Sequence, residues 1–188
     1  MSSLLPHKLI QVCEMRKLEE RIEIKASKQA VWDVMADFGS AAKWAPDMRH
    51  SSLKGELKTG VGTHRVMRHL WGFRIEEIVT RWEECAGYSF KLVKAPYPMR
   101  DVCETWVLQH DGNQALLAIT VSYGMRLGLL GALLDSVLVR FVVARQMRLG
   151  ICGLKHYVEK MYAKNLSVVP PASAVFSTEA APDVSATD

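Results

Sequence analysis

The C-terminal stretch from Leu127 to Ala163 constrains the fold more than any other part of the chain. It contains no proline, and its apolar residues recur at steps of three and four, which predicts one long helix. The predicted apolar stripe comprises Leu130, Leu134, Val137, Phe141, Ala144, Met147, Ile151, Leu154, Val158 and Met161. At 1.5 Å per residue the helix would be roughly 50 Å long, so it must lie across a broad partner.

The preceding residues read as strands. Residues 18–25 alternate apolar and charged side chains, which predicts a half-buried strand. Ser27 is placed to cap a helix, and a second short helix should end near Trp44, before Pro46. Six consecutive strands are then predicted at 49–56, 62–70, 73–84, 88–95, 102–110 and 115–125. The short turns between them, Asp111-Gly112 above all, predict antiparallel neighbours.

This order of elements predicts an α+β fold. A seven-stranded antiparallel sheet would pack on the long helix, because each needs a partner for its apolar face. A chain of 188 residues suffices for one such domain, which we expect to span residues 14–163. We expect a loose arm at 1–13 and a disordered tail at 164–188, where Ala, Ser, Pro and Val occur without periodicity.

Charge and motifs exclude several classes of function. The net charge of +4 is mild and spread along the chain, so a nucleic-acid partner is not expected. The four cysteines are far apart, which favours reduced thiols in a cytoplasmic protein, and no signal peptide is evident. His64 and His69 would face opposite sides of a strand, so they cannot bind one metal ion together. Gly60-Val61-Gly62 precedes a strand and not a helix, so it is not a nucleotide-binding glycine motif. We therefore expect no metal and no cofactor.

The helix also raises the question of a membrane. Leu127–Ala144 is mostly aliphatic and close to the length of a spanning helix. Asp135 and Arg140 lie inside it, and each would cost about 2.5–3.5 kcal/mol at the middle of a bilayer. A spanning helix is therefore disfavoured, whereas peripheral contact with a membrane surface stays open.

Several short motifs, together with the order of elements, resemble a known superfamily. They are Trp44-Ala45-Pro46, the GVGTHR run at 60–65, the EIVTRW run at 77–82 and the LGLLGALLD run at 127–135. These resemble the START-like, or Bet-v-1-like, superfamily (SRPBCC), and within it the polyketide cyclase/dehydrase and lipid-transport family. The resemblance covers about residues 17–162. It implies a helix-grip fold, with the sheet wrapped around the C-terminal helix and an apolar cavity between them.

The resemblance also implies a range of functions. Members bind lipids, sterols, polyketides, hormones or other aromatic molecules, and some catalyse the cyclisation or dehydration of polyketides. The fold alone does not choose among these.

The resemblance and strand alternation together predict a lining for the cavity. In relatives the basic residue after the Gly-x-Gly-Thr turn, here Arg65, faces inward, and the turn around Tyr97 overhangs the cavity mouth. Alternation then gives the other inward positions. The predicted ligand-binding residues are Met67, Ile75, Tyr88, Phe90, Tyr97, Glu104, Trp106, Leu108, Ile119, Val121, Tyr123, Val137 and Phe141.

Three polar residues are candidates for catalysis. His69 or Glu77 would act as a general base, and Arg65 would clamp a ligand carboxylate or enolate. The alternative, which we favour, is that Arg65 and Glu77 neutralise each other, because buried charges need partners. A strict two-residue turn at Trp71-Gly72 would place Val66 opposite Glu77, so an irregular turn is needed to bring Arg65 beside it.

These observations favour a carrier or binding protein for a hydrophobic small molecule. A polyketide-cyclase-like enzyme that uses the polar cavity residues is the first alternative. The second is an interaction protein that docks a partner or membrane through Leu127–Val143, because this segment has more apolar surface than one sheet face needs. The surplus could line the cavity entrance, form a homodimer contact or touch a membrane.

Overall fold

The computed structural model describes residues 15–112 and 114–168. In chain order the elements are β1 (Arg16–Ile24), α1 (Lys28–Ala36), the 3₁₀ helix η1 (Phe38–Lys43), β2 (Met48–Lys54), β3 (His64–His69), β4 (Arg74–Glu83), β5 (Gly87–Leu92), β6 (Met99–Asp111), β7 (Gln114–Met125), α2 (Gly128–Leu134), the π-helical segment η2 (Asp135–Val139) and α3 (Arg140–Val168). The predicted order is confirmed. The predicted arm at 1–13 lies outside the described residues, and α3 continues to Val168, past the predicted start of the tail at 164.

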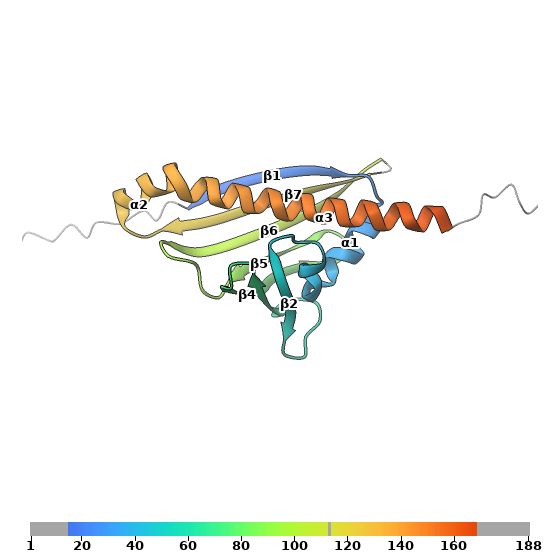
Figure 1. Cartoon of the computed structure of the whole chain (residues 1–188), viewed down its shortest axis with the longest axis horizontal. Helices are drawn as coiled ribbons and strands as arrows, with labels where there is room; N and C mark the ends of the chain where they lie inside the picture. Colours follow the sequence, from blue (N-terminus) through green and yellow to red (C-terminus); the bar gives the residue numbers. More distant parts are fainter. Residues whose placement is uncertain (1–14, 113, 169–188) are drawn as a thin grey trace, which may run out of the picture.

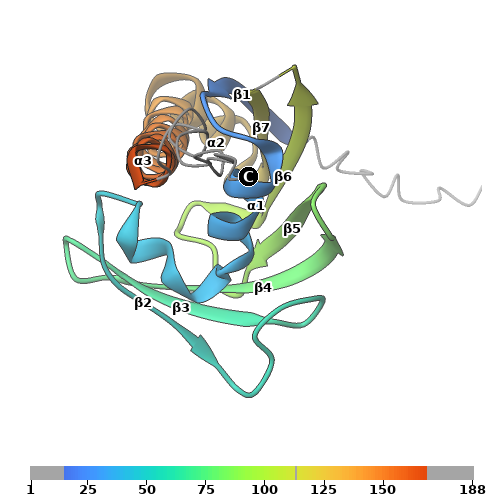
Figure 2. The ribbon, with the colours of Figure 1, turned by 90° about the vertical axis from the view of Figure 1, so that its right-hand side faces the viewer.

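The strands form one seven-stranded antiparallel sheet in the order β1-β7-β6-β5-β4-β3-β2. The helix formed by α2, η2 and α3 runs along β1 and β7 (Figure 1). Seen along this helix, the sheet curls so that β2, β3 and β4 lie on the opposite side of the interior (Figure 2). This arrangement is the predicted helix-grip fold.

The core fills the inner side of the curl. Along β7 every second side chain from Ala115 to Tyr123 is buried, as expected for a strand with one face on a core. The N-terminus of α1 is capped by Ser27, whose Oγ accepts a hydrogen bond from Ala30 N at 3.2 Å, and α1 buries Val31, Trp32 and Met35. Strand β1, α1 and the helix therefore close one side of the interior.

The turn between β3 and β4 settles the register of the inner polar residues. His69 N donates to Phe73 O at 3.0 Å, so the loop has three residues, Leu70-Trp71-Gly72, instead of two. Gly72 has φ of +85°, a conformation that favours glycine in such loops. Arg65 consequently pairs with Glu77 across the ladder, and both point inward.

The buried side of the long helix differs from the predicted stripe in its first half. From Met147 onward four of the five predicted positions are buried, at Met147, Ile151, Leu154 and Val158, and the fifth, Met161, is exposed. Before that, the inward positions are Gly131, Asp135 and Val139, each four residues apart, because the π-helical turn at η2 widens the period. The apolar pattern missed this face because glycine and aspartate occupy two of its positions.

Asp135 fixes the start of the helix to the sheet. It is 4% exposed, accepts a hydrogen bond from Tyr123 Oη at 2.6 Å and lies 3.3 Å from Arg16 Nε. A Cβ atom at Gly131 would lie 1.9 Å from Arg126 O, so glycine permits the close approach of the first turn to the preceding backbone. The helix start is thus held by specific contacts to β7 and β1.

Candidate functional site

Arg65 and Glu77 form a closed ion pair on the inner face of β3 and β4. Arg65 Nε donates to Glu77 Oε2 at 2.9 Å, its Nη2 contacts the same oxygen, and its Nη1 donates to Phe38 O at 3.0 Å. The guanidinium also lies 3.8 Å from the centre of the Phe38 ring. Both side chains are buried, so each charge is satisfied by the protein itself. The pairing favoured from the sequence is confirmed.

His69 joins the β3–β4 hairpin to the helix. Its Nδ1 accepts a hydrogen bond from Trp71 N at 3.1 Å, and its Nε2 lies 3.4 Å from both Asp47 Oδ2 and Gln146 Nε2. The ring stacks on Phe73 with centres 4.2 Å apart. Both ring nitrogens are thus engaged where α3 crosses β3. The catalytic roles of His69, Glu77 and Arg65 remain predictions, and these contacts give each residue a structural role.

Glu104 is an inward carboxylate that is only half-buried. It lies on β6, paired with Phe90 on β5 and Val121 on β7, and accepts a hydrogen bond from Trp106 Nε1 at 2.6 Å. Burial raises the pKa of Glu104 to about 7, the nearby charge of Glu77 raises it too, and the bond from Trp106 opposes both. Near neutral pH a substantial fraction of this carboxyl is therefore protonated and able to donate a hydrogen bond.

Trp44 brings an unused donor to the same region. Its ring lies 5.7 Å from the Trp106 ring, centre to centre. Its indole N–H is buried and has no hydrogen-bond acceptor among the described residues. A buried donor without an acceptor costs stability, so such groups often mark a place where another molecule completes the bond. Trp44 and Glu104 thus both border Trp106.

Several apolar side chains on the sheet and the helix are only half-buried. They come from β4, β5, β6, β7 and the helix, and they pack against the buried core: Ile75, Leu92, Met99, Met125, Leu134 and Val143. Leu92 pairs with Glu77, and Met99 pairs with Met125. An apolar molecule at this end of the interior would meet aliphatic and thioether groups, with Glu104 as the polar exception.

Most of the predicted lining residues are buried parts of the wall. Tyr88 stacks on Trp106, with centres 5.9 Å apart, and lies 5.5 Å from the Phe38 ring. Tyr123 is occupied by Asp135. The buried set comprises Met67, Tyr88, Phe90, Trp106, Leu108, Ile119, Val121 and Tyr123. Their ligand contacts remain predictions, and a molecule in the interior would reach only the side chains that border the half-buried region.

Two predicted helix residues lie elsewhere. Val137 and Phe141 are 66% and 70% exposed, so they do not line the interior. The reason is the π-helical turn, which makes Asp135 and Val139 the inward positions and turns the residues between them outward. Tyr97 is also exposed, on the loop between β5 and β6. These three residues belong to the surface of the protein.

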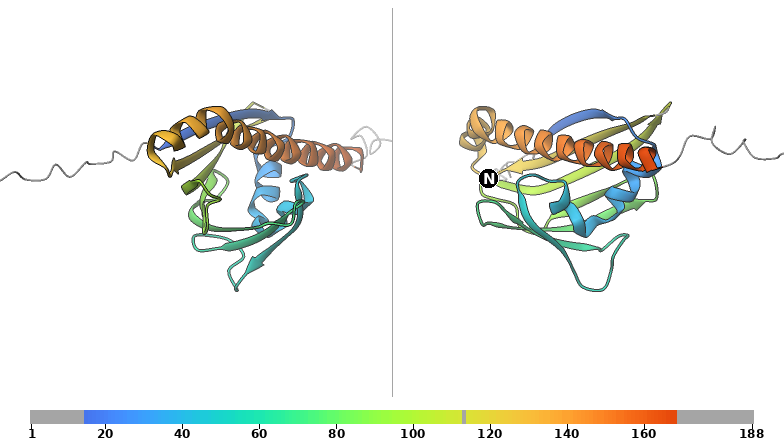
Figure 3. Two further views of the ribbon diagram at one scale, coloured as in Figure 1. Left: turned by 60° about the vertical axis from the view of Figure 1, so that its left-hand side comes forward. Right: turned by 45° about the vertical axis from the view of Figure 1, so that its right-hand side comes forward.

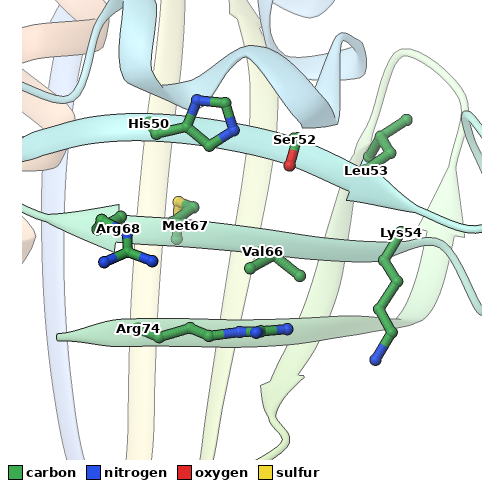
Figure 4. A pocket seen from close by; sticks show the side chains of 8 residues that line it. All are labelled: His50, Ser52, Leu53, Lys54, Val66, Met67, Arg68 and Arg74. Carbon is green, nitrogen blue, oxygen red and sulfur yellow. The ribbon is translucent and has the colours of Figure 1, made fainter.

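The described surface has hollows on both sides of the curled sheet. One, of about 460 Å³, lies on the outer side of β2, β3 and β4 and is lined by His50, Ser52, Leu53, Lys54, Val66, Met67, Arg68 and Arg74 (Figure 4). Another, of about 590 Å³, lies between η1 and α3 and is lined by Ala42, Lys43, Trp44, Ala45, Pro46, Met48, Gly153, His156, Tyr157, Lys160, Met161 and Lys164. The second borders Trp44 and therefore adjoins the candidate site.

Comparison with known protein families shows the family to which the chain belongs. The family described as "Polyketide cyclase / dehydrase and lipid transport" matches residues 15–159, which include the sheet and most of the helix. The chain belongs to this family. Among curated proteins, none matches the chain in sequence.

Solved structures agree with the helix-grip fold of this family. A protein of Thermus thermophilus is 16% identical, with a TM-score of 0.64, and the match covers 78% of this chain and 99% of that one. The Zhui aromatase/cyclase of Streptomyces sp. R1128 is 15% identical, with a TM-score of 0.62 and coverage of 78% and 95%. Ara h 8.0201 is 11% identical, with a TM-score of 0.60 and coverage of 81% and 100%. At these identities the likeness concerns the fold alone.

Two further findings concern metals and membranes. In the part of the chain that the structure describes, no three His, Cys, Asp or Glu residues gather as metal ligands. Over the same residues, no helix combines the length and apolar character needed to cross a bilayer.

Proposed function

We propose that this family member is a carrier or binding protein for an apolar small molecule that bears a carbonyl or hydroxyl oxygen. The molecule would lie between the inner face of the sheet and the helix, beside Glu104 and Trp106. The observation that supports this is that two groups with unused hydrogen-bonding capacity, the Trp44 indole and the Glu104 carboxyl, both border Trp106. The Trp44 N–H has no acceptor among the described residues, and the Glu104 carboxyl carries a proton for part of the time at neutral pH. One ligand oxygen could accept from both.

The surroundings support a neutral oxygen in place of a carboxylate. The guanidinium of Arg65 is occupied by Glu77 and Phe38 O, so it offers no free positive charge to a ligand anion. Glu104 would also repel an anion whenever it is ionised. The rest of the region is apolar, and Met99 and Met125 have flexible side chains that adapt to ligands of different shape. The expected ligand is therefore neutral and mostly apolar.

Binding of a fluorescent ketone tests this proposal. We expect Prodan, an acylnaphthalene, to bind more tightly than an alkylnaphthalene of similar size, because only Prodan has a carbonyl acceptor. Glu104→Gln should keep this preference, since the amide still donates a hydrogen bond, whereas Glu104→Leu should reduce it about tenfold.

Glu83→Leu provides a matched control, because Glu83 is an exposed glutamate on β4 of the same sheet and pairs with Arg81. Equal affinity of the wild type for the two naphthalenes would contradict the proposal. Equal effects of the Glu104→Leu and Glu83→Leu substitutions would do so as well.

One observation also supports an enzymatic function of the cyclase type. A carboxyl with a pKa of about 7 is suited to general acid–base catalysis at neutral pH, and Glu104 has such a pKa. In an aldol-type ring closure the enol carbon of one β-ketone unit would attack a second carbonyl carbon, so a carbon–carbon bond forms as the C=O π bond opens. Glu104 would give its proton to the oxygen of the attacked carbonyl, and the resulting carboxylate would take up the proton that the enol hydroxyl releases. A poly-β-ketone thioester is a suitable test substrate, with aromatic product detected by absorbance and mass spectrometry. Glu104→Gln should then keep Prodan binding and lose turnover about a hundredfold or more, whereas absence of turnover in the wild type would leave the binding function alone.

The peripheral membrane contact and the homodimer considered from the sequence both remain predictions. Either would use the exposed apolar side of α2 and α3, because the opposite side of this helix packs on β1 and β7.

A further inference from the structure

The first half of the long helix exposes apolar side chains. Six residues in α2, η2 and the start of α3 are each more than half exposed: Leu130, Leu133, Val137, Leu138, Phe141 and Val142. A helix on the surface of a protein normally turns polar residues to solvent on the side away from the core. Here that side is apolar, and no described part of the chain covers these side chains.

The tip of the β3–β4 hairpin extends this surface. Trp71 is 84% exposed, and Phe73 beside it is also exposed. Phe73 stacks on His69, whose Nε2 lies 3.4 Å from Gln146 Nε2 on α3. Val142 lies one helical turn before Gln146 and hence on the same side of α3. The hairpin tip and the exposed helix residues therefore form one continuous surface, which we call the apolar rim.

The loop between β5 and β6 adjoins the other end of the apolar rim. Pro98 O accepts a hydrogen bond from Arg126 N at 2.9 Å, which holds this loop against the start of α2. Tyr97, next to Pro98, is 71% exposed. The left view of Figure 3 shows the start of the helix, this loop and the β3–β4 turn on one side of the molecule. Two aromatic loop tips thus flank the exposed helix residues.

Positive charge surrounds the apolar rim. Arg68 and Arg74 face each other directly across the hairpin, and His50 pairs with Arg68 on the next strand (Figure 4). Arg74 Nη2 is paired with Glu76 Oε1 at 2.9 Å, whereas Arg68 has no ion pair among the described residues. Arg126 and Arg145 are exposed beside the helix part of the rim. Asp135 is the one acidic residue between 126 and 149, and it is buried against Tyr123 and Arg16.

We infer that the apolar rim docks on an anionic lipid bilayer. Exposed aliphatic residues on one side of a helix, with aromatic residues at loop tips, suit the boundary between head groups and acyl chains. Arginines at the margin suit anionic head groups. A second copy packed about a two-fold axis would instead bring the same arginines together. The inference does not depend on the ligand proposed above.

Vesicle co-sedimentation of the full chain tests this inference. The protein should bind vesicles of phosphatidylcholine with about 30% phosphatidylglycerol, and bind less when salt is raised. Phe141→Glu should abolish binding. The double substitution Arg68→Gln and Arg74→Gln should weaken it about thirtyfold, from roughly one kcal/mol for each arginine. Val61→Glu, which changes an apolar residue with 62% exposure on the β2–β3 loop, should leave binding unchanged.

Three results would overturn the inference. The first is that the wild type does not bind the anionic vesicles. The second is that Phe141→Glu and Val61→Glu bind equally well. The third is that light scattering shows a dimer which Phe141→Glu dissociates, because the rim would then be a contact between two copies. Prodan binding without vesicles should be the same in Phe141→Glu and the wild type, so failure of docking can be told apart from failure of ligand binding.

Discussion

Two carboxylates on the inner face of the sheet, Glu77 and Glu104, differ in how they are satisfied. Glu77 is buried and paired with Arg65, whose remaining donor goes to Phe38 O. Glu104 is half-buried, has Trp106 as its hydrogen-bond donor and has a pKa raised to about 7. The difference teaches that a charged residue on the inner face is not by itself a functional group. A closed pair stabilises the fold, whereas a carboxyl with unused capacity beside a half-buried region is available to a ligand.

The largest expected effect concerns the closed pair. Glu77→Gln would leave the Arg65 charge buried without a counter-charge, so the free energy of unfolding should fall by about 3–5 kcal/mol. Urea denaturation followed by circular dichroism measures this. Glu76→Gln is the control, because Glu76 pairs with His64 and Arg74 on the outer face, and its substitution should cost much less stability than Glu77→Gln. Equal losses in both variants would show that the Arg65–Glu77 pair is not the structural element we describe.

Glu104 should respond to pH in the opposite way to a paired carboxylate. Its pKa in the folded protein is about 7, above the ordinary value of 4.5, so the folded state binds the proton more tightly than the unfolded state. Its contribution to stability is thus fully present below about pH 4.5 and is lost as pH rises through 7. Glu104→Gln removes this loss.

We therefore expect Glu104→Gln to be more stable than the wild type by about 3 kcal/mol at pH 8, with little difference at pH 4.5. Urea denaturation of the wild type and the variant at pH 8 and at pH 4.5 measures the two differences in stability. A constant difference between wild type and variant across this range would contradict the raised pKa.

Asp135 is a second satisfied carboxylate, and its partner Tyr123 offers a smaller test. Tyr123→Phe removes the hydrogen bond from Tyr123 Oη while the ring stays, so the free energy of unfolding should fall by about 1.5 kcal/mol. Arg16 remains beside Asp135 and limits the loss. Hydrogen exchange of the amides in α2 and η2 should accelerate in this variant. Unchanged exchange there would mean that Asp135 does not hold the helix start.

The smallest effect on stability should come from the exposed part of the helix. Phe141→Ser and Val137→Ser should each change the free energy of unfolding by less than about 0.5 kcal/mol, because neither side chain is packed. Val139→Ser, at a buried position between them, should cost about 2 kcal/mol or more. Thermal unfolding of the three variants and the wild type measures these differences in stability. A large loss in Phe141→Ser would place that ring in the core after all.

Much of the fold was predictable because local patterns and global packing agree. Strand alternation and turn residues gave the sheet, and the absence of proline after Leu127 gave the long helix. The register of β3 against β4 was not predictable, because it depends on whether the loop at Trp71-Gly72 has two residues or three. One added residue reverses which side of the strand faces inward, and it decides whether Arg65 or Val66 meets Glu77.

The candidate site was predictable only in part. Glu104 stood out as the charged member of an otherwise apolar series with Val102, Trp106 and Leu108, and the sequence placed it in the lining. Its difference from Glu77 depends on distant partners that no spacing reveals. The unsatisfied N–H of Trp44 was missed for the same reason, since a buried tryptophan normally finds an acceptor. Val137 and Phe141 were misplaced because a π-helical turn has no clear apolar signature.

The indole N–H signals of the tryptophans test the central claim most directly. Trp32 and Trp82 both donate to Glu84, Trp106 donates to Glu104, and Trp44 has no acceptor among the described residues. In a ¹H–¹⁵N spectrum, with signals assigned by single Trp→Phe substitutions, Prodan should move the signals of Trp44 and Trp106 and leave those of Trp32 and Trp82 in place. If Prodan binds and Trp44 does not move, or if only the exposed Trp71 moves, the ligand site is not beside Glu104 and the account is wrong.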